Sequence, residues 1–144
     1  KISDIQAVID KIDPLPGAIE FVAWLRAQAP FVVLSDTFYE FAAPLMAKLG
    51  HPTLFCNSLE IDSEGDIVDY HIRKRDGKRH AVIAFKHLEF RVIAMGDSYN
   101  DTTMLVEADE GILFRPPDNV VAEFPQFPVM REYDELKTHL ERLL

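Results

Sequence analysis

Two carboxylates four residues apart follow an apolar segment of the chain, a spacing suited to metal chemistry. The segment Arg91–Met95 contains Val92 and Ile93 and predicts a buried strand, after which come Asp97 and Asp101. Asp97 then lies at the carboxyl end of a strand, where open α/β sheets bind ligands. The carboxylates repel each other unless a positive charge lies between them, and Mg²⁺ prefers oxygen ligands. The alternative is that Asp97 occupies a turn and Asp101 caps a helix.

A hydroxyl group follows a second apolar segment in the same way. Phe31–Leu34 predicts a strand that stops at Ser35, Asp36 and Thr37. A hydroxyl beside backbone N–H groups is suited to binding phosphate oxygens. The alternative is a cap for a helix over Phe38–Leu49, and both roles are compatible because helix N-termini bind anions.

A lysine in the basic run Arg73–His80 is the third candidate. Lys78 follows Gly77 and opens a predicted helix, so its ammonium is expected near the carboxyl edge of the sheet. Lys86, further along the same helix, is a weaker alternative. Most charges in such a run face solvent, and that reading holds for the neighbours of Lys78.

The elements that must position these groups alternate along the chain. The pattern predicts strands at Phe31–Leu34, Leu54–Ile61, Ile67–Arg73, Arg91–Met95, Gly111–Phe114 and Val129–Arg131. It predicts helices at Ile2–Ile12, Ala18–Ala27, Phe38–Leu49, Arg79–Leu88, Thr102–Ala108, Pro117–Glu123 and Tyr133–Leu144. The acidic loop Asp62–Asp66 indicates a hairpin. Alternating strands and helices predict an α/β fold with a parallel sheet.

Composition excludes some classes of function. The 144 residues carry a net charge of −9, which argues against general binding to nucleic acid or to anionic membranes. No apolar run approaches the ~18 residues of a membrane span. The single cysteine, Cys56, excludes an intrachain disulfide framework and suits a reducing compartment. We therefore expect a cytoplasmic protein.

Taken in order, these features resemble a known superfamily. A hydroxyl after a strand, a lysine before a helix and Gly-Asp-x-x-x-Asp after a strand are the second, third and fourth motifs of the haloacid dehalogenase-like (HAD-like) phosphohydrolases. The segments Leu34–Phe41, Gly96–Leu105 and Glu123–Pro128 are similar to the phosphoserine phosphatase branch. They are most similar to its phosphoserine:homoserine phosphotransferase members, the ThrH type. The resemblance implies a Rossmann-like core with a parallel sheet flanked by helices, plus a β-hairpin.

The first motif of the superfamily has no counterpart in this sequence. That motif is Asp-x-Asp or Asp-x-Glu on the first strand, before Ser35. None of the early acidic residues ends an apolar strand: Asp4, Asp10, Asp13 and Glu20. We therefore expect residues 1–13 to be a remnant of a cap helix and residues 14–144 to be the core domain. The first strand and most of the cap are then absent, and the sequence is the latter part of a longer polypeptide.

The resemblance also implies roles for individual residues. The catalytic residues would be Ser35, Lys78, Asp97 and Asp101. Asp97 would be the Mg²⁺ ligand, and Asp101 would steady a metal-bound water or Lys78. Substrate contacts would come from Ser35, Asp36, Lys78 and Asn100.

The implied reaction is Mg²⁺-dependent phosphoryl transfer from phosphoserine to water or homoserine. It would pass through an aspartyl-phosphate whose nucleophile lies outside this chain. The partner would be a small phosphorylated amino acid, with no nucleic acid and no membrane, and a homodimer is open.

Two other classes of function remain as alternatives. One is an inactive fragment or structural domain, which the missing nucleophile favours for this chain alone. The other is a receiver-like regulatory module that binds phosphate and Mg²⁺. The order Ser35, Lys78, Asp97 argues against a receiver, because receivers place their acidic cluster early in the chain.

Overall fold

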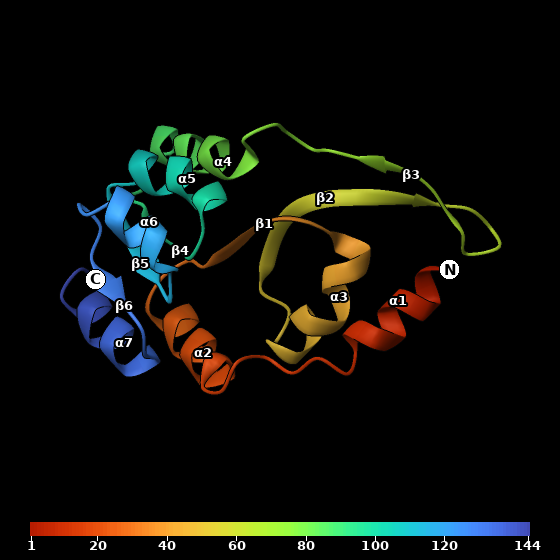
Figure 1. Ribbon diagram of the computed structural model, residues 1–144, viewed down its shortest axis with the longest axis horizontal. Coiled ribbons are helices and arrows are strands. Elements are labelled where there is room, and N and C mark those ends of the chain that lie inside the picture. Colours follow the sequence, from red (N-terminus) through yellow and green to blue (C-terminus); the bar gives the residue numbers. More distant parts are fainter. The chain divides into compact units, whose positions relative to one another are not determined.

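The computed structural model describes residues 1–144 and divides them into two compact units, Lys1–Arg75 and Asp76–Leu144 (Figure 1). The first unit contains α1 (Ile2–Ile9), α2 (Ala18–Gln28), β1 (Val32–Phe38), α3 (Tyr39–Lys48), β2 (Thr53–Ile61) and β3 (Ile67–His71). The second contains α4 (Gly77–His87), β4 (Ile93–Gly96), the 3₁₀ turn η1 (Tyr99–Asp101), α5 (Thr102–Glu107), β5 (Glu110–Phe114), α6 (Asp118–Glu123), β6 (Val129–Met130) and α7 (Tyr133–Glu141).

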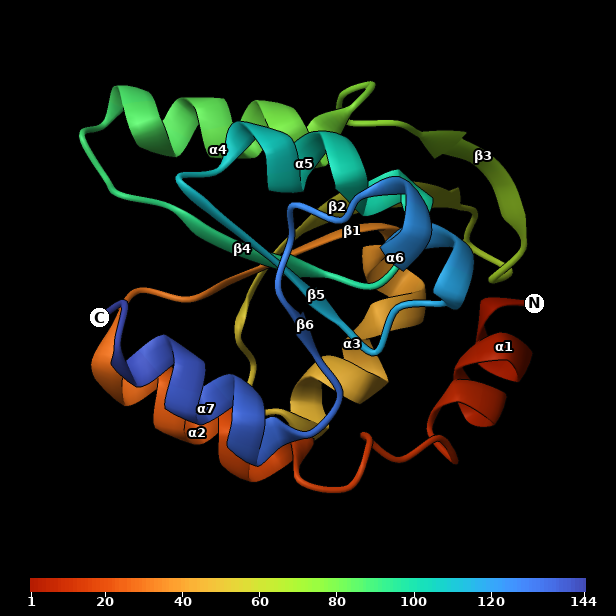
Figure 2. The same ribbon diagram turned by 60° about the vertical axis from the view of Figure 1, so that its left-hand side comes forward.

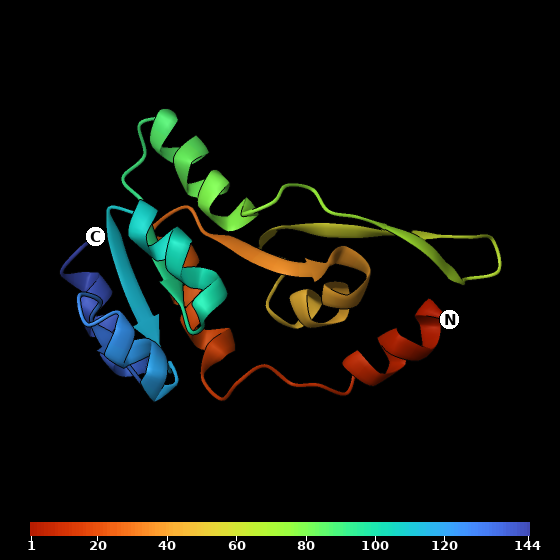
Figure 3. The same ribbon diagram turned by 45° about the horizontal axis from the view of Figure 1, so that its top comes forward.

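The first unit is built on a three-stranded sheet of order β1-β2-β3. β1 and β2 are parallel and are connected through α3, which packs on both strands, as Figure 3 shows. β2 and β3 form the predicted antiparallel hairpin. Its loop is closed by the Asp62 carboxylate, which accepts hydrogen bonds from the N–H groups of Glu64 and Asp66, both at 2.9 Å.

β1 does not stop where the sequence pattern predicts. The strand continues through Ser35 to Phe38, so the expected end at Leu34 is wrong. The register moves from Leu34 opposite Phe55 to Phe38 opposite Asn57, four residues along β1 against two along β2. Ser35 and its two successors therefore form a bulge, an irregularity that re-aims side chains and is frequent beside active sites.

The second unit is built on an all-parallel sheet of order β4-β5-β6. Figure 2 shows α4 and α5 on one side of this sheet and α7 on the other. Ile112 and Leu113 on the central strand are fully buried. Gly111 permits this packing, because a Cβ atom there would lie 2.6 Å from the Leu105 carbonyl oxygen.

The predicted α/β class with parallel strands and flanking helices is confirmed. Several boundaries differ: the first helix ends at Ile9 rather than Ile12, and the last at Glu141 rather than Leu144. Pro14 disfavours helical backbone at Asp13, which limits how far α1 extends. The assignment of residues 1–13 to a cap stays a prediction. None of the helices has the length and apolar character needed to cross a lipid bilayer.

Candidate active site

A lysine and an aspartate form a buried ion pair in the second unit. The Nζ atom of Lys78, in the first turn of α4, donates to Oδ1 of Asp101 at 2.7 Å. Asp101 ends η1 and immediately precedes α5. Charge-assisted hydrogen bonds of this length are among the strong ones. The pairing of these two predicted site residues places a fixed positive charge at the carboxyl end of β4.

The second oxygen of the Asp101 carboxylate holds the backbone that follows β4. Oδ2 accepts from the N–H of Asp97 at 2.9 Å and from the N–H of Ser98 at 3.2 Å. Burial raises the pKa of Asp101, but the hydrogen bonds from Lys78 and from these N–H groups outweigh it, so the pKa lies below its ordinary value. Asp101 is thus an ionised structural anchor, with both oxygens engaged.

Gly96 lets Asp101 reach this position. A Cβ atom on Gly96 would lie 2.5 Å from Cβ and 2.6 Å from Cγ of Asp101. Real Cβ atoms do not approach other atoms so closely, so the glycine of the Gly-Asp motif is required by contact rather than by its backbone angles.

α4 is held on α5 by contacts that also fix Lys78. Arg79 pairs with the Glu107 carboxylate at 3.2 Å, and Lys86 donates to the Glu107 carbonyl at 2.9 Å. Val82, between them on α4, is buried. Because Lys86 is committed to the far end of α5, the structure does not bring this weaker alternative to Asp101.

Asp97 differs from Asp101 in that its carboxylate is exposed and has no hydrogen-bond or ion-pair partner. Its backbone N–H is held by Asp101, so the main chain of Asp97 is fixed while its carboxylate oxygens face solvent. No group of three acidic, histidine or cysteine side chains that could hold a metal is present. Mg²⁺ is commonly held by one or two carboxylates with water and substrate oxygens. The exposed Asp97 carboxylate fits one ligand of such a set.

η1 is tied to α6 by contacts that the sequence did not predict. The hydroxyl of Tyr99 donates to the Glu123 carboxylate, and its ring packs edge-on against Phe124 at 6.1 Å between centroids. Ser98 donates through its hydroxyl to the side chain of Asn100. These contacts order the turn that carries Asn100, the residue expected to contact substrate.

Ser35 and Asp36 belong to the first unit. The half-buried Ser35 hydroxyl oxygen accepts a hydrogen bond from the N–H of Thr37 at 3.2 Å, and Asp36 is exposed. α3 begins at Tyr39 with Phe38 as its N-terminal flanking residue and no side-chain cap. The alternative in which these residues cap α3 is therefore wrong.

Buried and basic groups that the sequence reasoning did not identify surround this bulge. Asn57 donates to the Asp36 carbonyl at 3.0 Å and accepts from the Arg73 N–H at 3.0 Å. The Arg73 guanidinium donates to the Cys56 carbonyl and to the hydroxyl of Tyr39. Cys56 itself is buried, and burial raises its pKa. No local pattern marks Asn57, because its partners come from distant parts of the sequence.

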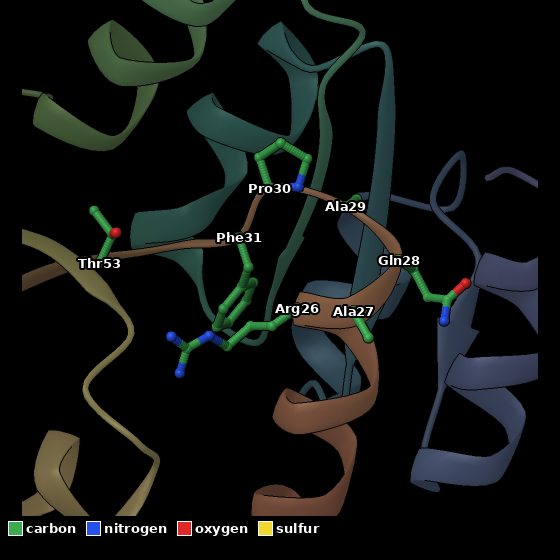
Figure 4. A pocket seen from close by; sticks show the side chains of 7 residues that line it. All are labelled: Arg26, Ala27, Gln28, Ala29, Pro30, Phe31 and Thr53. Atoms are coloured by element: carbon green, nitrogen blue, oxygen red, sulfur yellow. The ribbon is translucent and has the colours of Figure 1, made fainter.

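The first unit also has a hollow of about 380 Å³ between the end of α2 and the starts of β1 and β2 (Figure 4). Its lining includes Arg26, Phe31 and Thr53. The Arg26 guanidinium is already engaged with the Gly50 carbonyl at 2.8 Å. None of the predicted site residues lines this hollow, which lies at the amino ends of the strands.

Comparison with known proteins places these motifs in a family. A model described as a haloacid dehalogenase-like hydrolase matches residues 1–109. The chain is 60% identical over 137 residues to a phosphoserine phosphatase of Pseudomonas syringae pv. tomato, covering 95% of this chain and 58% of that protein. It is also 60% identical over 137 residues to the phosphoserine phosphatase ThrH of Pseudomonas aeruginosa, covering 95% and 67%.

Solved structures show the same fold. A crystal structure of phosphoserine phosphatase from T. onnurineus matches with a TM-score of 0.70 at 25% identity, covering 94% of this chain and 62% of that one. An apo-form phosphoserine phosphatase matches with a TM-score of 0.78 at 23% identity, covering 95% and 72%. The chain thus spans between 58% and 72% of the length of these four proteins.

Proposed function

We propose a phosphatase function for this chain, which belongs to the haloacid dehalogenase-like hydrolase family. The proposed activity is hydrolysis or transfer of the phosphoryl group of a small phosphomonoester, of the phosphoserine phosphatase type. One observation carries this proposal: the buried Lys78–Asp101 pair lies beside the exposed, unpartnered carboxylate of Asp97 at the carboxyl end of β4. A fixed cation and a free carboxylate at this edge suit the charges of phosphoryl transfer.

Lys78 has a defined electrostatic part in this proposal. Its ammonium is held by Asp101 and by the start of α4, so it costs little reorganisation when negative charge develops on a transferring phosphoryl group. Asp101 acts through Lys78 and through the backbone of Asp97. We assign Asp101 as a positioning residue for that reason.

Asp97 is the residue that would hold Mg²⁺. When bound, the ion would neutralise charge on the phosphoryl oxygens and orient the phosphate. Asp97 contributes one carboxylate, held at its backbone by Asp101. The remaining ligands are not assigned to residues of this chain.

The covalent step is proposed to use an aspartate outside this chain. Its carboxylate oxygen would bond to phosphorus as the bond from phosphorus to the substrate alkoxide breaks, and a second carboxylic acid would protonate that alkoxide. Ser35 would donate a hydrogen bond from its hydroxyl group to a phosphoryl oxygen. Hydrolysis or transfer to an acceptor hydroxyl would then release the phosphoryl group.

Phosphoserine is the proposed substrate, with water or homoserine as acceptor. The names of the two Pseudomonas relatives, both phosphoserine phosphatases, support phosphoserine as the substrate. Asp36 and Asn100 are proposed to contact the amino-acid part, and the protein is proposed to act in the cytoplasm.

The test is phosphate release from phosphoserine by the complete protein, measured with Mg²⁺ and with excess EDTA. We expect release only with Mg²⁺, and Asp97→Asn should remove most of it and weaken the apparent affinity for Mg²⁺. Asp134→Asn, an exposed aspartate in the first turn of α7, is the matched control and should be unaffected. Absence of release from the wild-type protein would contradict the proposed function.

A further inference from the structure

The buried side chain of Asn57 holds a peptide group beside the Ser35 hydroxyl. Asn57 lies on β2 and is 8% exposed. Its Nδ2 atom donates to the Asp36 carbonyl at 3.0 Å, and its Oδ1 atom accepts from the Arg73 N–H at 3.0 Å. Rotating the amide by half a turn would place oxygen against a carbonyl and nitrogen against an N–H. Only one orientation of Asn57 therefore satisfies both partners.

The Asp36 carbonyl and the Thr37 N–H are the two ends of one planar peptide group. Asn57 grips the carbonyl end, and the N–H end donates to Oγ of Ser35 at 3.2 Å. Fixing one end of the plane fixes the direction of the other. The orientation of the Ser35 hydroxyl thus depends on the Asn57 amide, although Asn57 and Ser35 are not hydrogen-bonded to each other.

The bulge in β1 makes this support necessary. Between Leu34 and Phe38 the ladder to β2 is irregular, so the intervening backbone lacks regular strand pairing. A carbonyl in such a segment needs another partner, and Asn57 supplies it to Asp36. Without that partner, the peptide that orients Ser35 would be free to turn toward solvent.

The other side of Asn57 is anchored as well. The backbone N–H of Arg73 donates to Asn57. The Arg73 side chain donates from Nε to the Cys56 carbonyl at 3.0 Å and from Nη2 to the Tyr39 hydroxyl at 3.1 Å. The guanidinium also lies 5.7 Å from the centroid of the Tyr39 ring. This second anchor prevents the Asn57 amide from following a displaced bulge.

We propose that Asn57 is a positioning residue that directs the Ser35 hydroxyl proton toward a phosphoryl oxygen, acting through the Asp36–Thr37 peptide. Because the Thr37 N–H occupies a lone pair of the Ser35 oxygen, the hydroxyl proton remains available for donation. The role of Ser35 in phosphate binding rests on the proposed function. The clamp, by which Asn57 holds the Asp36–Thr37 peptide against Ser35, rests on the hydrogen bonds of the first unit.

The experiment is a double-mutant cycle in the complete protein with phosphoserine and Mg²⁺. Asn57→Ala should lower kcat/KM by about tenfold to a hundredfold, the range typical of residues that support an active-site group from behind. In an Ser35→Ala background the same change should have little further effect, because the hydroxyl it orients is gone. Asn57→Asp should behave like Asn57→Ala, since it keeps the acceptor for Arg73 but loses the donor for Asp36.

Leu25→Ala controls for loss of stability, because Leu25 is a buried residue of α2 in the same unit. It should leave kcat/KM per folded molecule close to wild type. Losses from Asn57→Ala and Ser35→Ala that multiply in the double variant would overturn the proposal. So would an Asn57→Ala effect no larger than that of Leu25→Ala.

Hydrogen exchange at the Thr37 amide separates this inference from the proposed function. Exchange should be faster in Asn57→Ala than in wild type or Leu25→Ala, because the peptide is no longer held. Equal exchange in all three proteins would overturn the clamp. If the Thr37 amide exchanges faster in Asn57→Ala and the wild-type protein releases no phosphate, the positioning role of Asn57 is supported and only the proposed function is contradicted.

Discussion

Lys78 and Asp101 are 23 residues apart in the sequence, yet their charged atoms lie 2.7 Å apart and their side chains are only 11% and 9% exposed. Such a pair costs desolvation of both ions, so its contribution to stability is smaller than its geometry suggests. Removing one partner is different, because the other charge is then buried without compensation. The pair therefore couples the stability of the second unit to the position of the Asp97 backbone at the end of β4.

Replacing Lys78 by methionine should destabilise the protein strongly. The variant leaves the Asp101 carboxylate buried and without its cation, and the expected loss is about 3–5 kcal/mol in the free energy of unfolding. Urea unfolding at neutral pH measures it. Lys11→Met, at an exposed position, is the control and should change little. A Lys78→Met loss as small as the control would show that the pair is not buried in solution.

Asp101 should make unfolding depend on pH in the acid range. Its pKa in the folded protein lies below the ordinary value of 3.8, so the folded state favours the ionised form. The resulting stability is fully present above the unfolded pKa and is lost as the pH falls through the folded pKa. The gap in unfolding free energy between wild type and Asp101→Asn should therefore be constant from pH 7 to 5 and narrow below about pH 4. A gap that widens on acidification would contradict the assignment.

The sequence predicted the grouping of Lys78, Asp97 and Asp101 in the second unit better than the bulge in the first. The spacing of Asp97 and Asp101 and the position of Lys78 are local features next to recognisable strands and helices. The carboxyl ends of parallel strands lie at the same edge of a sheet, so these residues are expected at that edge. The bulge depends on the register between β1 and β2, which no local pattern contains. Asn57 and Arg73 were missed because a lone asparagine on a strand and an arginine in a basic run carry no signal until their partners are known.

A Cβ atom on Gly96 should disturb the Asp101 anchor. Gly96→Ala places that atom 2.5 Å from Cβ of Asp101, so either β4 or the carboxylate must shift. We expect a loss of about 1–3 kcal/mol, the usual cost of overpacking, together with lower phosphatase activity per folded molecule. Gly77→Ala, at the first residue of α4, is the control for adding a methyl group and should be near neutral. Equal unfolding free energies for both alanine variants would contradict the close contact.

Cys56 should be inert toward thiol reagents while the protein is folded. The side chain is 3% exposed, and burial raises its pKa, so little thiolate is present or accessible. Reaction with a chromogenic disulfide at pH 8 should be slow in buffer and fast in urea, with one thiol released per chain. Cys56→Ser should abolish the signal in urea and controls for other reacting groups. Rapid modification in buffer, at the rate seen in urea, would mean that β2 opens readily at this position, next to Asn57.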